Sequence, residues 1–200
     1  MASAIAAILL DHAGRPLLEV VEHNGARAQG QSAGNPPHEF FHVRVRNRPA
    51  RRPLSGRRPA WACQATLEVL TEDGNARLLD PIPARWISQP EPILTLGIGG
   101  GTAQIPDVAR MLAGRRIDIH NHEDQVMSVA LKFEGVADCH LFTNESYVFS
   151  RWQNPAWSLP RGRHRLRVTV YYERGRAQRD FWLHNEGDRR DDVRIKAQPA

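Results

Sequence analysis

The sequence predicts an all-β protein, an antiparallel β-sandwich with long loops. The first observation is strict alternation over residues 162–172, where Leu166, Val168 and Val170 fall on one face and arginines on the other. The second is that about eight segments with apolar alternation are separated by glycine- and proline-containing turns. A strand with one apolar face needs a covering layer, so the segments are predicted to form two facing sheets.

Each predicted strand combines this alternation with β-branched or aromatic residues and ends near a turn-forming residue. The predicted strands are residues 15–21, 40–47, 61–70, 76–79, 93–96, 126–133, 159–172 and 178–183. Within residues 126–133, the alternation places four apolar side chains on one face, those of Met127, Val129, Leu131 and Phe133.

The connecting segments predict one domain with long loops. Residues 24–37 are rich in glycine and proline, and residues 48–59 are rich in arginine and proline, so neither is predicted to be a central strand. We expect an N-terminal segment over residues 1–14, a single β-sandwich domain over residues 15–184, and a solvated C-terminal segment of mixed charge over residues 185–200.

Composition is that of an ordinary globular protein, with 41% hydrophobic and 24% charged residues. No apolar run approaches the roughly 18 residues of a membrane span, and the apolar residues 4–10 lack the basic flank of a secretory signal. Cys63 and Cys139 are too few for a disulfide framework. These observations predict a cytoplasmic protein with no membrane association.

The formal net charge of +5 and the pI near 9.9 are compatible with nucleic-acid binding. All the basic residues except Lys132 and Lys196 are arginine, however, and alanine, glycine and proline are abundant. These residues share GC-rich codons, so genome composition explains the bias without any partner. Charge alone therefore does not predict a nucleic-acid-binding function.

Two passages resemble immunoglobulin-like modules of the CARDB and fibronectin type III sort. Residues 43–47 with residues 62–69 are similar to the V-x-V-x-N … A-x-x-x-V-x-V hairpin of those modules. Residues 159–170 resemble their L-x-x-G-x-Y-x-L-x-V-x-V strand, with His164 where an aromatic residue is usual. Residues 15–196 also resemble uncharacterised prokaryotic proteins of this type. The resemblance implies an immunoglobulin-like sandwich, and it implies no catalytic residue.

Two groups of residues are candidates for ligand binding. Tyr147, Trp152 and Trp157 lie in an amide-rich connection, where flat aromatic faces can stack on sugar rings or bases or can instead close the end of the sandwich. Arg44 and Arg46 alternate along residues 40–47, where guanidinium groups can contact phosphates or an acidic protein. In an immunoglobulin-like order, this strand and residues 159–172 lie in different sheets, so their arginines do not form one patch.

Two further patterns point to chemistry. His120 and His122 form an H-x-H pattern that is suited to zinc or iron if it lies on a strand, and a polar turn with exposed imidazoles is the alternative. The glycines of residues 97–101 precede a helical pattern, as in a dinucleotide site, but Thr102 occupies the third glycine position and Pro106 interrupts the helix. The alternative for these glycines is a turn between two strands.

The residues therefore favour a non-catalytic interaction or accessory module that binds a protein partner and needs no cofactor. Nucleic-acid or carbohydrate binding through the arginines or aromatics is the second interpretation, and a metal-dependent enzyme built on His120 and His122 is the third. Cys63 and Cys139 lie at alternating strand positions, which are typical of buried thiols rather than nucleophiles.

Overall fold

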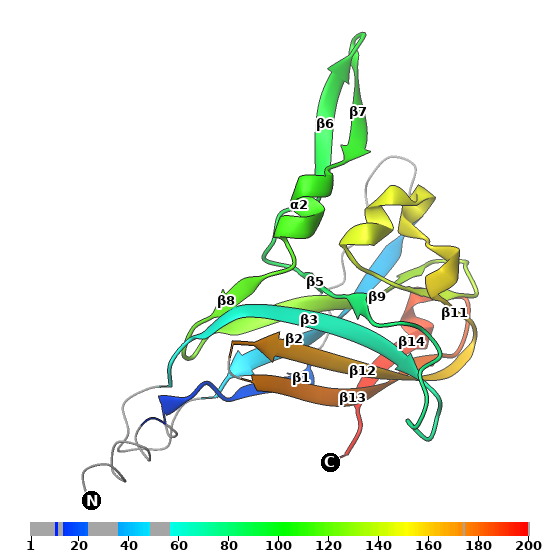
Figure 1. The fold of residues 1–200 in the computed structure, drawn as a ribbon. Helices are drawn as coiled ribbons and strands as arrows, with labels where there is room; N and C mark the ends of the chain where they lie inside the picture. Colours follow the sequence, from blue (N-terminus) through cyan, green and yellow to red (C-terminus); the bar gives the residue numbers. More distant parts are fainter. Residues whose placement is uncertain (1–10, 12–13, 24–35, 49–56, 174, 200) are drawn as a thin grey trace, which may run out of the picture.

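The computed structural model describes residues 11, 14–23, 36–48, 57–173 and 175–199. These residues form antiparallel sheets that pack against each other, and strands account for 53% of the structure (Figure 1). The predicted all-β sandwich is therefore confirmed. Most of the predicted N-terminal segment and most of the predicted loops 24–37 and 48–59 lie outside the described residues.

The first sheet has six strands in the order β1–β2–β9–β10–β11, and β5 pairs with β9 beside β10. Their bounds are Leu18–Glu22 (β1), His38–Asn47 (β2), Arg85–Trp86 (β5), Asp124–Phe133 (β9), Cys139–Leu141 (β10) and Ser158–Leu159 (β11). Three short 3-10 helices between β10 and β11 carry the predicted aromatic connection, namely Asn144–Val148 (η1), Ser150–Trp152 (η2) and Pro155–Trp157 (η3).

The second sheet has six strands in the order β14–β13–β12–β3–β4, and β8 also pairs with β3. Their bounds are Ala60–Leu70 (β3), Ile82–Pro83 (β4), Ile117–Ile119 (β8), Gly162–Tyr172 (β12), Gly175–Asn185 (β13) and Val193–Ala197 (β14), with the 3-10 helix Arg190–Asp192 (η4) before β14. Every pairing in the two sheets is antiparallel.

The core lies between the two sheets and follows the alternation of the sequence. On β12, Leu166, Val168 and Val170 are fully buried against the facing sheet. On β2, Val43 and Val45 are also fully buried and belong to the same core. The facing layer that β12 was predicted to need is therefore present, and it is the first sheet. Every second side chain of an alternating strand points to one face, and on β12 this face is the core.

The predicted face of residues 126–133 is wrong in its second half. Met127 belongs to the main core, whereas Leu131 and Phe133 belong to a separate cluster on the outer side of the first sheet. The β2–β9 register shifts between Phe41 and His42, so β9 contains an extra residue. A β-bulge of this kind exchanges the two faces of a strand beyond it, which alternation alone does not reveal.

The prediction of a solvated segment from residue 185 onwards is also corrected. Asn185 is fully buried at the end of β13, and β14 pairs with this strand over five residue pairs. The buried Lys132 of β9 fixes this end of the molecule. Its ammonium group donates to Asn185 Oδ1 at 2.9 Å and to the carbonyl oxygens of Ala137 and Gly187 at 2.7 Å each.

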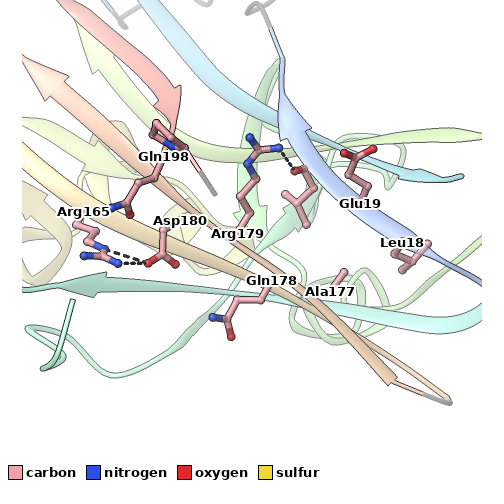
Figure 2. A pocket seen from close by; sticks show the side chains of 10 residues that line it. Leu18, Glu19, Arg165, Ala177, Gln178, Arg179, Asp180 and Gln198 are labelled. Carbon is pink, nitrogen blue, oxygen red and sulfur yellow. Dashed lines mark hydrogen bonds and ion pairs between the residues drawn. The ribbon is translucent and has the colours of Figure 1, made fainter. Parts of the chain in front are cut away.

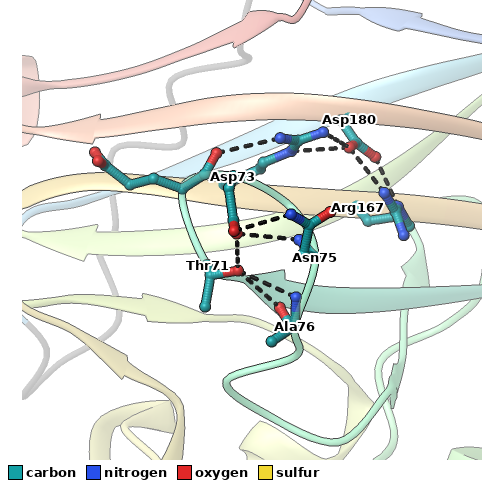
Figure 3. A network of polar contacts seen from close by, with 8 residues as sticks. Thr71, Asp73, Asn75, Ala76, Arg167 and Asp180 are labelled. Carbon is teal, nitrogen blue, oxygen red and sulfur yellow. Dashed lines mark hydrogen bonds and ion pairs between the residues drawn. The ribbon is translucent and has the colours of Figure 1, made fainter.

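A polar network closes the outer face of the second sheet (Figure 3). Asp180 of β13 accepts hydrogen bonds from Arg165 at 2.7 Å and from Arg167 at 2.8 Å, both on β12. In the nearby turn after β3, Asp73 accepts from the Asn75 backbone N–H at 3.1 Å. The arginine face of β12 is therefore engaged in contacts within the protein.

A third, two-stranded sheet projects from one end of the sandwich (Figure 1). It consists of β6, Ile93–Ile98, and β7, Gly101–Pro106, and is followed by the short helix α2, Val108–Ala113. We call β6, β7 and their turn, residues 93–106, the arm. The strand predicted over residues 93–96 is part of it, whereas β7 was not predicted.

Candidate binding surfaces

The arm is amphipathic, and its apolar face is uncovered. Leu94 pairs with Ile105 and Leu96 pairs with Ala103, so these four side chains lie on one face of the hairpin. Leu94, Leu96 and Ile105 are 37%, 43% and 42% exposed, in contrast to the fully buried side chains of the sandwich core. A monomeric protein seldom leaves such a contiguous face open without a binding role.

The arm also differs from the body in charge. Residues 93–106 contain no Asp, Glu, Lys or Arg, although 24% of the whole chain is charged. The apolar character continues onto α2, where Val108 and Leu112 are 65% and 56% exposed while Met111 is buried. The arm and α2 together therefore form the main exposed apolar surface among the described residues.

Hydrogen bonds fix the base of the arm on the body. The Asp107 backbone N–H donates to Pro92 O at 2.8 Å, and the Arg110 guanidinium donates to Ile93 O at 3.1 Å. The Asn144 side chain of η1 donates to Met111 O at 3.2 Å. An isolated two-stranded hairpin is marginally stable in water, so these contacts hold the strands where their apolar face has no cover.

The predicted glycine cluster forms the tip of the arm. Gly99 and Gly100 have φ values of 52° and 88°, a left-handed conformation that favours glycine, and an added side chain at either residue would meet open space. The glycines lead into β7 and not into a helix. They therefore do not form the phosphate cradle of a dinucleotide site, and the interpretation as a turn between two strands holds.

The predicted aromatic residues Tyr147 and Trp152 come together on the outer side of the first sheet. They pack with Phe40 of β2 and with Phe142, and the Phe40 and Phe142 ring centroids are 4.7 Å apart. Trp152 lies within 6.0 Å of Phe142, centroid to centroid. Trp157 is separate from this group, because it packs against the main core and contacts Phe149. The three predicted residues therefore do not form one stacking row.

Beside this cluster lies a pocket of about 230 Å³, which we call the aromatic pocket. It is lined by Phe40, His42, Arg85, Ile87, Glu91, Ser128, Phe142 and Tyr147. These residues come from β2, β5, β9 and the segments that follow β5 and β10. Of the residues that line it, only Tyr147 was predicted, since side chains from distant strands leave no local pattern in the sequence.

Three polar side chains that line the aromatic pocket are buried, those of His42, Arg85 and Ser128. Arg85 and His42 are each 6% exposed, and His42 Nδ1 has no hydrogen-bond partner. Burial, with a smaller contribution from the charge of His23, lowers the pKa of His42 to about 4, so its imidazole is neutral at pH 7. Burial also raises the pKa of Tyr147 to about 12, so its hydroxyl keeps its proton.

The predicted arginines Arg44 and Arg46 form ion pairs within the first sheet. Arg44 contacts Asp124 at 3.1 Å, and Arg46 contacts Glu19 at 3.4 Å. They lie on β2, whereas Arg165 and Arg167 lie on β12 of the other sheet. The prediction that the two arginine strands belong to different sheets is confirmed, and acidic neighbours reduce the charge that either strand offers to phosphate.

A polar groove runs between β1 of the first sheet and β13 of the second (Figure 2). Its volume is about 820 Å³, and Arg179 crosses it to donate to Val20 O at 3.3 Å. On one side Arg165 is neutralised by Asp180, and on the other Glu19 pairs with Arg46. The groove therefore combines paired charges with one arginine, Arg179, whose guanidinium donates to a backbone carbonyl.

The two histidines do not lie on a strand. His120 and His122 belong to the turn between β8 and β9, both are exposed, and His122 has a φ of 64°. His120 contacts the exposed ring of Trp61 edge-on at 5.7 Å. No group of three metal-ligating side chains occurs among the described residues. The alternative of a polar turn with exposed imidazoles therefore describes this segment.

Both cysteines are buried, free thiols on strands, as predicted. Burial raises the pKa of each to about 12, so neither is a thiolate at neutral pH. In the part of the chain that the structure describes, no helix is long and apolar enough to cross a membrane. Comparison with family models, curated proteins and solved structures gives no match.

Proposed function

We propose that this protein is a non-catalytic interaction module of the immunoglobulin-like type, and that it binds a protein partner through the arm. The observation that carries the proposal is the uncovered apolar face of Leu94, Leu96 and Ile105 on an uncharged hairpin. Covering these apolar side chains with another surface removes them from water and lowers the free energy of the complex. A partner with an apolar groove or an open strand edge supplies that cover.

The arm favours a protein partner over a nucleic acid or a lipid bilayer. Binding to phosphates requires basic side chains, and residues 93–106 have none. Insertion into lipid would expose the outer backbone edges of β6 and β7 to hydrocarbon, where unpaired N–H and C=O groups cost several kcal/mol each. A protein strand that pairs with such an edge forms hydrogen bonds with these N–H and C=O groups, and the partner can cover the apolar face at the same time.

We place this interaction in the cytoplasm. The support is that Cys63 and Cys139 are both buried and form no disulfide. Such cysteines are typical of proteins that fold under reducing conditions.

The test is affinity capture from the source organism with three proteins: the wild type, the double variant Leu94→Ser/Leu96→Ser, and Leu78→Ser. Leu78 is 60% exposed and lies outside the arm, so it is a matched control for loss of an exposed leucine. We expect one partner at stoichiometric amounts with the wild type and with Leu78→Ser, and at least a tenfold loss with the double variant. Equal capture by all three proteins would falsify the proposal.

A further inference from the structure

The aromatic pocket contains a buried cation without a carboxylate partner. Arg85 is 6% exposed, and no Asp or Glu among the described residues lies within ion-pair distance of its guanidinium. Charged groups that are removed from water are normally paired with an opposite charge. This arginine therefore differs from Arg44, Arg46, Arg165 and Arg167, each of which has its own carboxylate.

The hydrogen bonds of Arg85 leave one edge of the guanidinium available. Nη1 and Nη2 both donate to Gln89 O, at 3.3 and 3.2 Å, and Nη1 also donates to Trp86 O at 3.0 Å. The edge that carries Nε–H and the second Nη2–H forms no hydrogen bond with another acceptor among the described residues apart from the Tyr147 hydroxyl, which interacts with both Arg85 and Glu91. Two parallel N–H groups on such an edge match the two oxygens of a carboxylate.

The rest of the pocket fits an apolar ring that carries such a carboxylate. Phe40, Phe142 and Ile87 supply apolar walls. Ser128 supplies a hydroxyl donor, and the neutral imidazole of His42, whose Nδ1 lacks a partner, supplies an N–H in one tautomer. A volume of about 230 Å³ is below that of pockets for drug-sized ligands, so one six-membered ring with a short substituent is the appropriate size.

We propose that the aromatic pocket binds a small organic acid, with its carboxylate on Arg85 and its ring packed against the wall that Phe40 and Phe142 form together. The source is either a free metabolite or an acidic side chain of a partner protein, because both present the same chemistry. Glu91 is the one acidic residue that lines the pocket, and its side chain is exposed to solvent. Water screens its repulsion of the ligand, whereas the attraction of the buried Arg85 is screened less.

The first test compares an aromatic acid with its neutral amide of the same shape and with a sugar, on the full-length protein. Benzoate, benzamide and methyl glucoside are titrated while chemical shifts of the pocket residues are followed by NMR. We expect millimolar or tighter binding of benzoate, with benzamide at least tenfold weaker and the glucoside weaker still. The proposal is overturned if benzamide binds as well as benzoate, if the glucoside binds best, or if benzoate at about 10 mM shifts no pocket resonance.

The second test uses two variants that change the charge of the residues lining the pocket. Glu91→Gln removes the negative charge that lines the pocket, and we expect it to tighten benzoate binding about twofold to threefold and to leave benzamide binding unchanged. Arg85→Gln removes the cation and should abolish the preference for benzoate, with folding checked from the NMR spectrum because Arg85 also holds residues 86–89. Weaker benzoate binding by Glu91→Gln would contradict the expected repulsion between Glu91 and the ligand carboxylate, and it would overturn the placement of an acid in this pocket.

A free metabolite and a partner side chain are then distinguished by competition. If the partner captured through the arm supplies the acid, benzoate at saturation should reduce its capture severalfold. If capture is unchanged, the pocket binds a free acid. Binding of benzoate does not depend on the arm, so the variant Leu94→Ser/Leu96→Ser should retain it in full. Failure of either proposal can therefore be recognised without the other.

Discussion

The sandwich and the arm are built from the same kind of strand, but only the sandwich covers its apolar face. On β12, Leu166 and Val168 alternate with arginines and are fully buried against the first sheet. On β6, Leu94 and Leu96 alternate in the same way and are 37% and 43% exposed. The pattern of a strand thus indicates which face is apolar, whereas the cover depends on which other segments come into contact.

Charge sharpens the difference between the two regions. Each arginine on the outer face of β12 and β2 meets an acidic neighbour, as Arg165 meets Asp180. The arm has no charged residue, so nothing within it keeps another strand away from its edges. Natural proteins usually protect open strand edges with charges or bulges, and the arm has neither of these protections. An unprotected edge is suited to pairing with a partner strand.

The largest expected difference between the sandwich and the arm is in the free energy of unfolding when one leucine of each region is replaced by alanine. Leu166→Ala leaves a cavity in the core and should lower the free energy of unfolding by about 3 kcal/mol. Leu96→Ala removes an exposed side chain and should change it by less than about 0.5 kcal/mol. Urea unfolding followed by tryptophan fluorescence measures both values. Equal losses would mean that the arm is part of the cooperative core.

The fold of the sandwich was largely predictable from sequence. Alternation identified β2, β3, β9, β12 and β13. One face of each of these strands packs on the core, and the other face meets solvent or the second hydrophobic cluster. The bulge in β9 was missed, because it depends on the partner strand. The signal for β14 was present in residues 193–197, where Val193, Ile195 and Ala197 alternate with basic residues, but the surrounding charges obscured it.

The candidate sites were less predictable. The arm had a readable signal, since residues 93–106 combine alternation with a complete lack of charge. The aromatic pocket had no such signal, because Arg85, His42 and Ser128 are brought together by β5, β2 and β9. The burial of Arg85 also depends on the 3-10 segment that carries Tyr147, whose ring lies 5.7 Å from the guanidinium carbon. Long-range assembly of this kind cannot be inferred from one sequence.

Replacing Lys132 is expected to have the next largest effect on the free energy of unfolding, since its ammonium group holds the C-terminal end of the body. Lys132→Met keeps a similar volume but leaves Gly187 O and Asn185 Oδ1 without the donor that Lys132 supplies, while Ala137 O keeps the hydrogen bond from Asn185 Nδ2. Unsatisfied buried acceptors cost about 1–3 kcal/mol, so the free energy of unfolding should fall by about 2 kcal/mol. Lys196→Met on β14 is the exposed control and should have little effect. A Lys132→Met protein as stable as the wild type would contradict this role.

Replacing Asp180 should have a smaller effect on the free energy of unfolding, and this effect should depend on pH. Burial by itself raises the pKa of this carboxyl, but the hydrogen bonds and charges of Arg167 and Arg165 outweigh burial and lower the pKa overall. Because the pKa is lower in the folded than in the unfolded protein, the carboxylate stabilises the fold above the unfolded value of about 3.9. That stabilisation is lost as the pH falls through the folded pKa.

The variant Asp180→Asn should therefore be about 1 kcal/mol less stable than the wild type at pH 7, and the difference should shrink as the pH falls below about 4. Urea unfolding at a series of pH values measures the difference. Asp188→Asn is the control, because the Asp188 side chain is 49% exposed and its pair with Arg161 lies in solvent. A difference that stays constant down to pH 2 would show that the charge of Asp180 is not responsible.

The smallest effect on stability is expected in the arm itself. The double variant Leu94→Ser/Leu96→Ser removes apolar surface that no other part of the described chain covers, so the free energy of unfolding should change by less than about 0.5 kcal/mol. The surface itself should change much more: a dye that fluoresces on exposed apolar surface should bind the folded wild type and bind the double variant severalfold less, while Leu78→Ser keeps the wild-type signal. If the double variant is markedly less stable, the two leucines pack against the body in solution, and the contrast between an open arm and a closed sandwich is lost.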